Sequence, residues 1–142
     1  MESVVGIIQA YRGTGRRITP QRHAVMSVLA GNHSHPTAEA VHAAVTATMP
    51  TVSLRTVYSV LGELVELGEV LQLDLGTGSA RFDPNTASHH HLVCERCGSV
   101  SDVQVDHPDV RPLPPDADDF RIDGTQIVFR GECAQCASAA VT

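Results

Sequence analysis

Residues 1–68 show apolar side chains every three or four positions, the spacing that places them on one face of a helix. Residues 2–12 form the first such stretch, and each of the next three follows a Ser or Thr that can cap a helix. Gly or Pro ends these three stretches. The predicted helices are residues 2–12 and the stretches from Thr19 to Gly31, from Thr37 to Pro50 and from Ser53 to Gly68.

The periodicity then changes to the alternation of strands at residues 69–83, EVLQLDLGTGSARFD. Two short segments flank the glycine-rich turn GTGS, which predicts a β-hairpin. Helices followed by a hairpin in this order predict a winged helix-turn-helix domain over residues 1–83. A helical bundle that carries an unrelated hairpin is the alternative that this pattern leaves open.

The sequence changes in character from Pro84 onward. The stretch HHHLVCERCGSVSDVQV predicts strand, tight turn and strand, and FRIDGTQIVFRGECAQC predicts another strand pair that leads to a second tight turn. Between them, HPDVRPLPPDADD has too much Pro and Asp for regular structure. The predicted fold class is therefore α+β, with an N-terminal winged helix-turn-helix domain over residues 1–83 and a small α/β domain over residues 84–142.

Charge is distributed unevenly along the chain, whose net charge is −6. Residues 1–60 carry five arginines against two acidic residues, whereas residues 81–142 carry five arginines against ten. The first part can therefore approach nucleic-acid phosphates, and the second cannot. The apolar runs are too short to span a bilayer and the N-terminus has no signal-peptide pattern, so we expect a cytoplasmic protein with no membrane association.

The four cysteines form two Cys-x-x-Cys pairs, and each pair has a glycine neighbour that eases a tight turn. Thiols stay reduced in the cytoplasm, so the pairs favour metal binding over disulfides. Four thiolates complete a tetrahedral zinc site with no open position, which predicts a structural role. A redox dithiol is the alternative. The predicted zinc ligands are Cys94, Cys97, Cys133 and Cys136.

Three consecutive histidines precede the first cysteine pair. On a strand, alternate side chains share a face, so His89 and His91 point together and His90 points away. If the turn places Cys94 opposite Ser99, antiparallel pairing brings Asp102 opposite His91. Two imidazoles and a carboxylate on one face predict a second metal site. A cluster of exposed histidines without a function is the alternative.

Taken together, these segments resemble the ferric uptake regulator family of bacterial metal-dependent repressors. The segments that carry the resemblance are RITPQRHAVMSVL, HPTAE, VSLRTVYSVLGELVELGEV, RFD, HHHLVCERCG and GECAQC, in the family's order. They span nearly the whole chain. The resemblance implies a homodimeric transcriptional repressor that binds palindromic operator DNA, with a second domain that mediates dimerisation.

Within the family, the chain most resembles the peroxide-sensing branch, whose regulatory metal has three histidine and two aspartate ligands. The residues at those positions are His35, Asp83, His89, His91 and Asp102. The iron-sensing branch commonly has Glu at the position of Asp102, so the resemblance favours a repressor of oxidative-stress genes. Its regulatory ion would be Fe(II) or Mn(II), and peroxide would act by iron-catalysed oxidation of His35 or His89.

Two departures from the family pattern affect these expectations. Many relatives carry a further histidine ligand where this chain has Thr125, so we expect two metals per subunit. The family also has a helix between the two strand pairs of the second domain. The proline-rich segment 107–119 predicts that this helix is reduced or lost.

Arginine and tyrosine residues of the first domain are the candidates for DNA contact. Arg55 and Tyr58, one turn apart on the predicted recognition helix, can bond guanine and pack on a thymine methyl group. Core packing of Tyr58 is the alternative. Arg17 and Arg22, together with other arginines near them, are expected to contact phosphates.

Two other classes of protein compete with the repressor. A zinc hydrolase would need an open metal position and a general base, and no HExxH motif occurs, so we expect no enzyme activity. A plain zinc-ribbon interaction module would leave the first 80 residues unexplained. Within the family, an iron-uptake or zinc-uptake regulator is the alternative to the peroxide sensor.

Overall fold

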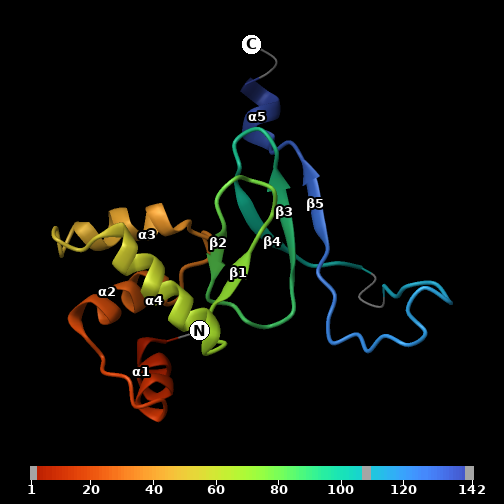
Figure 1. The fold of residues 1–142 in the computed structure, drawn as a ribbon. Helices are drawn as coiled ribbons and strands as arrows, with labels where there is room; N and C mark the ends of the chain where they lie inside the picture. The colour runs from red at the N-terminus through yellow and green to blue at the C-terminus, as the bar shows by residue number, and fades with distance from the viewer. Residues whose placement is uncertain (1–2, 107–109, 140–142) are drawn as a thin grey trace. The chain divides into compact units, whose positions relative to one another are not determined.

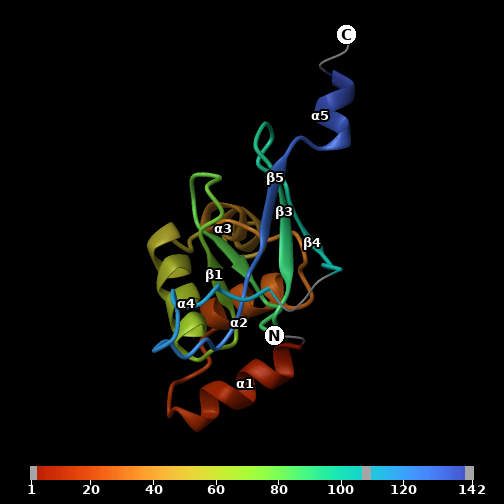
Figure 2. The ribbon, with the colours of Figure 1, turned by 90° about the vertical axis from the view of Figure 1, so that its right-hand side faces the viewer.

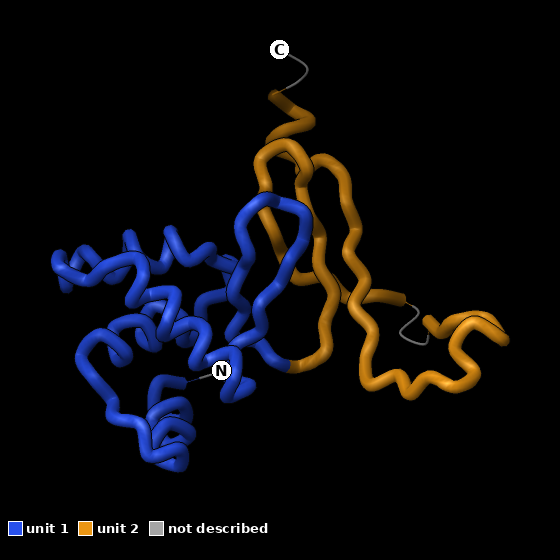
Figure 3. Tube along the Cα trace, in the orientation of Figure 1, with its two compact units in different colours: residues 1–86 blue, residues 87–142 orange. Residues whose placement is uncertain are grey.

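The computed structural model describes residues 3–106 and 110–139 of the chain, which divide into two compact units. Unit 1 is residues 1–86 and unit 2 is residues 87–142 (Figure 3). The change in sequence character at Pro84 thus falls just before the division between the units.

Unit 1 contains four helices followed by a two-stranded hairpin (Figure 1). Three of the helices begin where the sequence predicts, because the hydroxyl oxygens of Thr19, Thr37 and Ser53 each accept a hydrogen bond from the N–H three residues on. The elements are α1 (Val4–Gly13), α2 (Pro20–Leu29), α3 (Ala38–Thr46), α4 (Leu54–Glu66), β1 (Leu71–Leu73) and β2 (Arg81–Asp83).

The core of unit 1 lies among the four helices. One face of α4 is buried, and its apolar residues follow the helical spacing read from the sequence. The side chains on that face are Val57, Val60, Leu61 and Leu64, and they pack with apolar residues of α1, α2 and α3. This packing leaves the opposite face of α4, with Arg55 and Tyr58, outside the core.

The hairpin is tied to the segment that precedes α3. The backbone N–H of Phe82 donates to the carbonyl of Pro36 at 2.9 Å, and the guanidinium of Arg81 donates to the carbonyl of His35 at 3.1 Å. The side chain of Phe82 is buried in the core of unit 1. These contacts place His35 beside Asp83, which ends β2.

Unit 2 is built on a three-stranded sheet with β3 in the centre (Figure 2). The strands are β3 (His90–Cys94), β4 (Val100–Val103) and β5 (Val128–Gly131), and α5 (Ala134–Ala139) follows the last strand. The antiparallel register of β3 and β4 pairs His91 with Asp102. The register predicted from the sequence is therefore confirmed.

Unit 2 differs from the sequence prediction at two places. The segment 120–131 forms only β5 rather than a strand pair, and β5 runs parallel to β3. A strand that pairs in parallel with an earlier strand needs a long crossover connection, and residues 104–127 form this connection. The described residues of the connection contain no helix. Of the proline-rich segment 107–119, in which a reduced helix is expected, residues 110–119 are described and contain no helix, and residues 107–109 lie outside the described residues. The helix α5 was not predicted.

A polar network joins α1, α2 and α4 at the edge of the core. The guanidinium of Arg22 donates to both carboxylate oxygens of Glu63 at 2.9 Å, and the hydroxyl of Tyr11 donates to Oε2 of Glu63 at 2.9 Å. The hydrogen bonds from Arg22 hold the pKa of Glu63 below its ordinary value. Burial and the hydrogen bond to Glu63 raise the pKa of Tyr11.

We predict that Glu63→Gln lowers the free energy of unfolding by about 1–3 kcal/mol at neutral pH, because it breaks charge-assisted hydrogen bonds. The folded pKa of Glu63 is depressed, so its contribution is complete above the unfolded pKa and disappears as the pH falls through the folded pKa. Urea unfolding of both proteins at a series of pH values measures this. The difference in the free energy of unfolding between the wild type and Glu63→Gln should become smaller below about pH 4.

Glu66→Gln is the matched control, because Glu66 makes an exposed pair with Arg16 at 3.5 Å. It should change the free energy of unfolding by less than about 1 kcal/mol. A Glu63→Gln deficit that stays constant into acid, or one no larger than that of Glu66→Gln, would refute the assigned role of Glu63.

Candidate metal centres

The four cysteines of unit 2 converge at the end of the sheet. Their sulfur atoms all lie within 4.8 Å of one another, with Cys94 and Cys136 3.8 Å apart and Cys97 and Cys133 3.8 Å apart. Zinc–sulfur bonds of about 2.3 Å in a tetrahedron place the sulfurs roughly 3.8 Å apart. The cluster therefore fits a closed, structural zinc site, as the sequence predicts.

Tight turns and hydrogen bonds shape this cluster. Gly98 has a φ of 74°, a left-handed conformation that closes the turn after Cys97. The N–H of Cys94 donates to the carbonyl of Ser99 at 3.0 Å, which is the pairing assumed from the sequence. Arg96 of the first turn pairs with Glu132, next to the second. The two turns are thus held together by side chains as well as by sulfur.

The thiols of the cluster have very different proton affinities. Backbone N–H groups, first that of Cys97 and then that of Cys133, lower the pKa of Cys94 to about 6. Hydrogen bonding to Cys133 and burial raise the pKa of Cys136 to about 12. Four neighbouring thiolates repel one another unless a cation neutralises them, so this donor set is matched to a divalent soft metal.

The redox alternative is disfavoured by the same geometry. Cys133 and Cys136 do stand at the start of α5, the usual position of a redox pair. However, all four sulfurs lie within 4.8 Å of one another, and the sulfurs of Cys133 and Cys136 each lie 3.8 Å from a sulfur of the other pair. Four sulfurs that lie this close together, two from each Cys-x-x-Cys pair, are typical of a metal site rather than of an isolated dithiol.

We predict that Cys97→Ser abolishes tight zinc binding and lowers the melting temperature of unit 2, because structural zinc contributes folding free energy directly. Zinc content by atomic absorption and thermal unfolding measure both effects. Ser99→Ala is the control, since it removes only a 3.3 Å contact to Sγ of Cys97. A Cys97→Ser protein that lacks zinc but melts like the wild type would contradict a structural role.

A second group of ligands begins in unit 1 with His35 and Asp83. Nε2 of His35 lies 3.2 Å from Oδ2 of Asp83, and both side chains are only 1% exposed. The other carboxylate oxygen accepts the N–H of Asn85 at 2.9 Å, which orients Oδ2 toward the imidazole. His35 has a φ of 52°, which is rare outside glycine and is typical of functional positions.

Unit 2 brings together three further candidate ligands, as the strand alternation predicts. Oδ1 of Asp102 lies 3.3 Å from Nε2 of His89 and 3.5 Å from Nε2 of His91. The two imidazole rings meet edge to face, with centroids 4.6 Å apart. His91 is fully buried, whereas Asp102 is 36% exposed. The two imidazoles thus converge on a single carboxylate oxygen.

The second nitrogen of each of these histidines is also engaged. Nδ1 of His89 lies 2.6 Å from the carbonyl oxygen of Ala87, and Nδ1 of His91 lies 3.0 Å from the carboxamide of Gln126. A carbonyl oxygen only accepts, so His89 carries its hydrogen on Nδ1 and turns the Nε2 lone pair toward Asp102. Such an arrangement orients a metal-binding imidazole.

Each of these two groups of donors, taken by itself, has the chemistry and spacing that suit an ion of intermediate hardness. Ligand bonds of about 2.1 Å place neighbouring donor atoms roughly 3.0–3.5 Å apart, and the three His–Asp distances lie in this range. Imidazole and carboxylate donors suit Fe(II), Mn(II) or Zn(II). Asn85 and Gln126 were not predicted from the sequence, because no motif marks a backbone N–H or a carboxamide as the partner of a ligand.

His90 has a structural role that the spacing of histidines did not show. Its side chain points away from His89 and His91, and its Nδ1 accepts the backbone N–H of Ile127 at 3.0 Å. This contact holds the entry of β5 beside β3.

The candidate DNA-contact residues lie in unit 1, with Arg17 just before α2, Arg22 on α2, and Arg55 and Tyr58 on α4. Tyr58 is 45% exposed, and its hydroxyl donates to Oε1 of Glu39 at 3.0 Å, so it does not belong to the core. Arg55 is exposed one turn earlier. Arg22 is engaged by Glu63 and by the carbonyl of Arg17, so it also has a structural role. Sequence reasoning did not single out Glu39.

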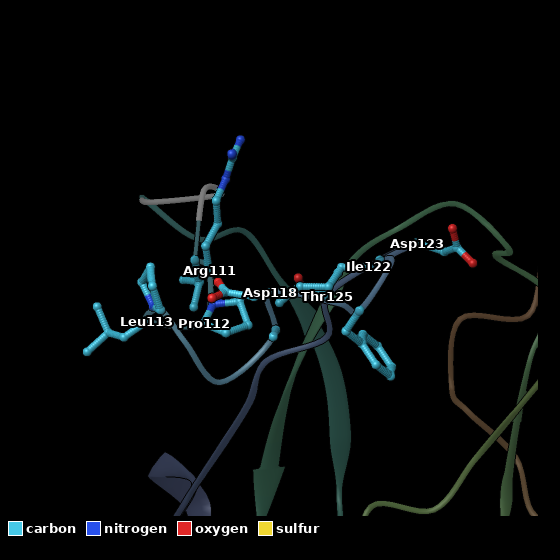
Figure 4. A pocket seen from close by; sticks show the side chains of 12 residues that line it. Arg111, Pro112, Leu113, Asp118, Ile122, Asp123 and Thr125 are labelled. Carbon is cyan, nitrogen blue, oxygen red and sulfur yellow. The ribbon is translucent and has the colours of Figure 1, made fainter.

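A cavity of about 560 Å³ lies in the crossover segment of unit 2 (Figure 4). Residues between 110 and 125 line this cavity, and they include Leu113, Asp118, Ile122 and Thr125. The described residues show metal-binding groups only at the four-cysteine cluster and among the histidines and aspartates above.

Comparisons with known proteins agree with this architecture. The profile of the Ferric uptake regulator family matches residues 13–118. The Peroxide-responsive repressor PerR of Staphylococcus epidermidis is 38% identical over 130 residues, which cover 91% of this chain and 87% of the relative. The chain belongs to the ferric uptake regulator family, and the resemblance noted in the sequence is confirmed.

Solved structures show the same fold. The ferric uptake regulator of Helicobacter pylori, described with three functional metal-binding sites, aligns with a TM-score of 0.76 at 16% identity, over 96% of this chain and 95% of that one. PerR from Streptococcus pyogenes aligns with a TM-score of 0.56 at 25% identity, over 96% and 94%. The family consists of DNA-binding transcription regulators, and this chain is a metal-dependent repressor of that family.

No helix among the described residues is long and apolar enough to cross a membrane.

Proposed function

We propose that this chain is a homodimeric, peroxide-responsive repressor whose regulatory ion, Fe(II) or Mn(II), is held by His35, Asp83, His89, His91 and Asp102 together. The observation that carries the proposal is the pair of oriented donor groups, one in each unit, with the Nε2 atoms of three histidines turned toward carboxylate oxygens. The relative from S. epidermidis, named for its response to peroxide, supports the choice of sensing chemistry.

The proposed role of the ion is to fix the two units in one arrangement. His35 and Asp83 belong to the DNA-binding unit, and the other three ligands belong to the unit that we propose mediates dimerisation. A shared ion would favour the arrangement in which both α4 helices of a dimer meet successive major-groove segments of a palindromic operator. Metal and DNA binding would then favour each other, because both select the same arrangement.

Bound Fe(II) would supply the electrons that reduce peroxide, which Mn(II) does far less readily. The imidazoles of His35 and His89 are the groups that we expect to gain an oxygen atom. His35 is buried against Asp83, and an oxidised ring would no longer present the Nε2 lone pair toward that carboxylate. Loss of one ligand would release the DNA-competent arrangement.

The proposed DNA interface is the exposed face of α4 and the arginines before it. Glu39 holds the hydroxyl of Tyr58, and this hydrogen bond raises the pKa of Tyr58. The ring is therefore restrained for contact with a base. Arg55 is the proposed guanine contact, and Arg17 and Arg22 are proposed to meet phosphates. Such a repressor acts in the cytoplasm, where we place this chain.

We predict that peroxide adds one oxygen atom to His35 or His89 in the Fe(II) form and releases operator DNA, whereas the Mn(II) form resists. Tandem mass spectrometry must locate the oxygen within the peptide, because cleavage at Arg22 and Arg55 leaves Met26 and Met49 on the same fragment as His35. His23 and His42 on that fragment are internal controls. Iron-loaded protein that keeps its operator without histidine oxidation would instead indicate an iron-uptake regulator.

We predict that Arg55→Ala weakens binding to a selected operator by about 1–3 kcal/mol and weakens binding to random DNA much less, as expected for a bidentate guanine contact. Fluorescence anisotropy on both DNAs, with Mn(II) present, measures the two losses. Arg17→Ala is the matched variant, and it should weaken both by similar factors. Equal losses for Arg55→Ala would reassign that residue to a phosphate.

A further inference from the structure

The carboxamide of Gln126 reaches a ligand of the proposed regulatory site. We propose that Gln126 is a positioning residue that keeps the hydrogen of His91 on Nδ1, so that Nε2 of His91 is presented as a metal ligand. This inference rests on the proposed function, because it assigns Gln126 a role at the same site.

The contact is short and its partner is rigidly held. The carboxamide nitrogen of Gln126 lies 3.0 Å from Nδ1 of His91, and a half-turn of the carboxamide places its oxygen at the same point. The His91 ring is fully buried and packs edge to face on His89. The ring therefore has little freedom to choose another partner for Nδ1.

The backbone just after Gln126 is held by two hydrogen bonds to β3. The next residue, Ile127, donates its N–H to Nδ1 of His90 and accepts the N–H of His91 at 3.1 Å. Both contacts come from β3, which β5 joins in parallel register from Val128 onward. The pairing of β5 with β3 therefore begins next to Gln126 and places the end of the crossover beside His91.

The position of one hydrogen atom decides whether His91 can bind an ion. A neutral imidazole carries a single N–H, and the metal needs the lone pair of the nitrogen that faces it. Nε2 of His91 faces Oδ1 of Asp102 at 3.5 Å. Without an acceptor at Nδ1, the hydrogen would move to Nε2 and bond Asp102. The carboxamide oxygen of Gln126 opposes this by accepting the hydrogen at Nδ1.

His89 shows the same arrangement with a different acceptor. Its Nδ1 bonds the carbonyl of Ala87, and its Nε2 faces the same Asp102 oxygen. With the carboxamide oxygen of Gln126 turned toward His91, both histidines have an acceptor at Nδ1 and a carboxylate opposite Nε2. The carbonyl of Ala87 cannot be removed by substitution, whereas Gln126 can, so Gln126 makes the arrangement testable.

The experiment compares Gln126→Leu and Gln126→Glu with the wild type. Leu removes the acceptor, whereas Glu keeps a group that only accepts from an imidazole N–H. Gln104→Leu is the matched control, because Gln104 is an exposed glutamine just after β4 that has no hydrogen bond to a histidine among the described residues. Mn(II) affinity is measured by electron paramagnetic resonance of unbound Mn(II). The tautomer of His91 in the metal-free chain is measured from its ring nitrogen shifts at mildly alkaline pH.

We expect Gln126→Leu to weaken Mn(II) binding by about tenfold to a hundredfold, the usual effect of removing a residue that orients a ligand. It should also move the His91 hydrogen from Nδ1 to Nε2. Gln126→Glu should retain the Nδ1–H form and bind Mn(II) at least as tightly as the wild type. Gln104→Leu should match the wild type, and the zinc content should stay constant in every variant.

Each result bears on one claim. If Gln126→Leu binds Mn(II) as tightly as the wild type, the role of Gln126 is refuted and the proposed function stands. A wild-type chain that binds no Mn(II) refutes the proposed function, and the tautomer then decides the role of Gln126 by itself. The same His91 tautomer in wild type and Gln126→Leu would overturn the inference.

Discussion

The hydrogen-bonded register of β3 is the constraint on which both metal centres of unit 2 depend. Its beginning pairs His91 with Asp102, and its end carries Cys94 into the four-sulfur cluster. Along its other edge, β5 delivers Gln126 near the first site and Cys133 near the second. A slip of one residue would turn every side chain of the strand to the opposite face and remove both centres together.

The zinc cluster can therefore act on the regulatory ligands without touching them. β5 has β3 as its strand partner, and α5 after it carries Cys136. The cysteine cluster connects the ends of β3 and β5. The hydrogen bonds between these two strands then keep the backbone N–H of Ile127 beside Nδ1 of His90. A parallel pair of four residues is weak by itself, since its long crossover must be ordered. A structural metal at the end of the pair offsets that entropy.

Local patterns predicted the parts of this structure that depend on neighbours in sequence. The caps Thr19, Thr37 and Ser53, the hairpin and the pairing of His91 with Asp102 all follow from spacing over a few residues. The parallel course of β5 and the contact of Gln126 depend on a crossover of more than twenty residues, and no periodicity encodes where such a chain returns. The positions of His35 and Asp83 were available only through the family resemblance.

The two metal-binding groups use different kinds of donor atom, and this explains how one chain can bind a different metal at each. Sulfur donors occur only at the cluster among the described residues, and imidazole and carboxylate donors form the other group. Soft thiolates retain zinc, whereas oxygen and nitrogen donors hold Fe(II) or Mn(II) more loosely. The buried carboxylate of Asp83 accepts the N–H of Asn85 and lies 3.2 Å from Nε2 of His35, and such contacts offset the cost of burying its charge. A regulatory ion that can leave is therefore coupled to the conformation of the residues around it, which a permanently bound zinc could not be.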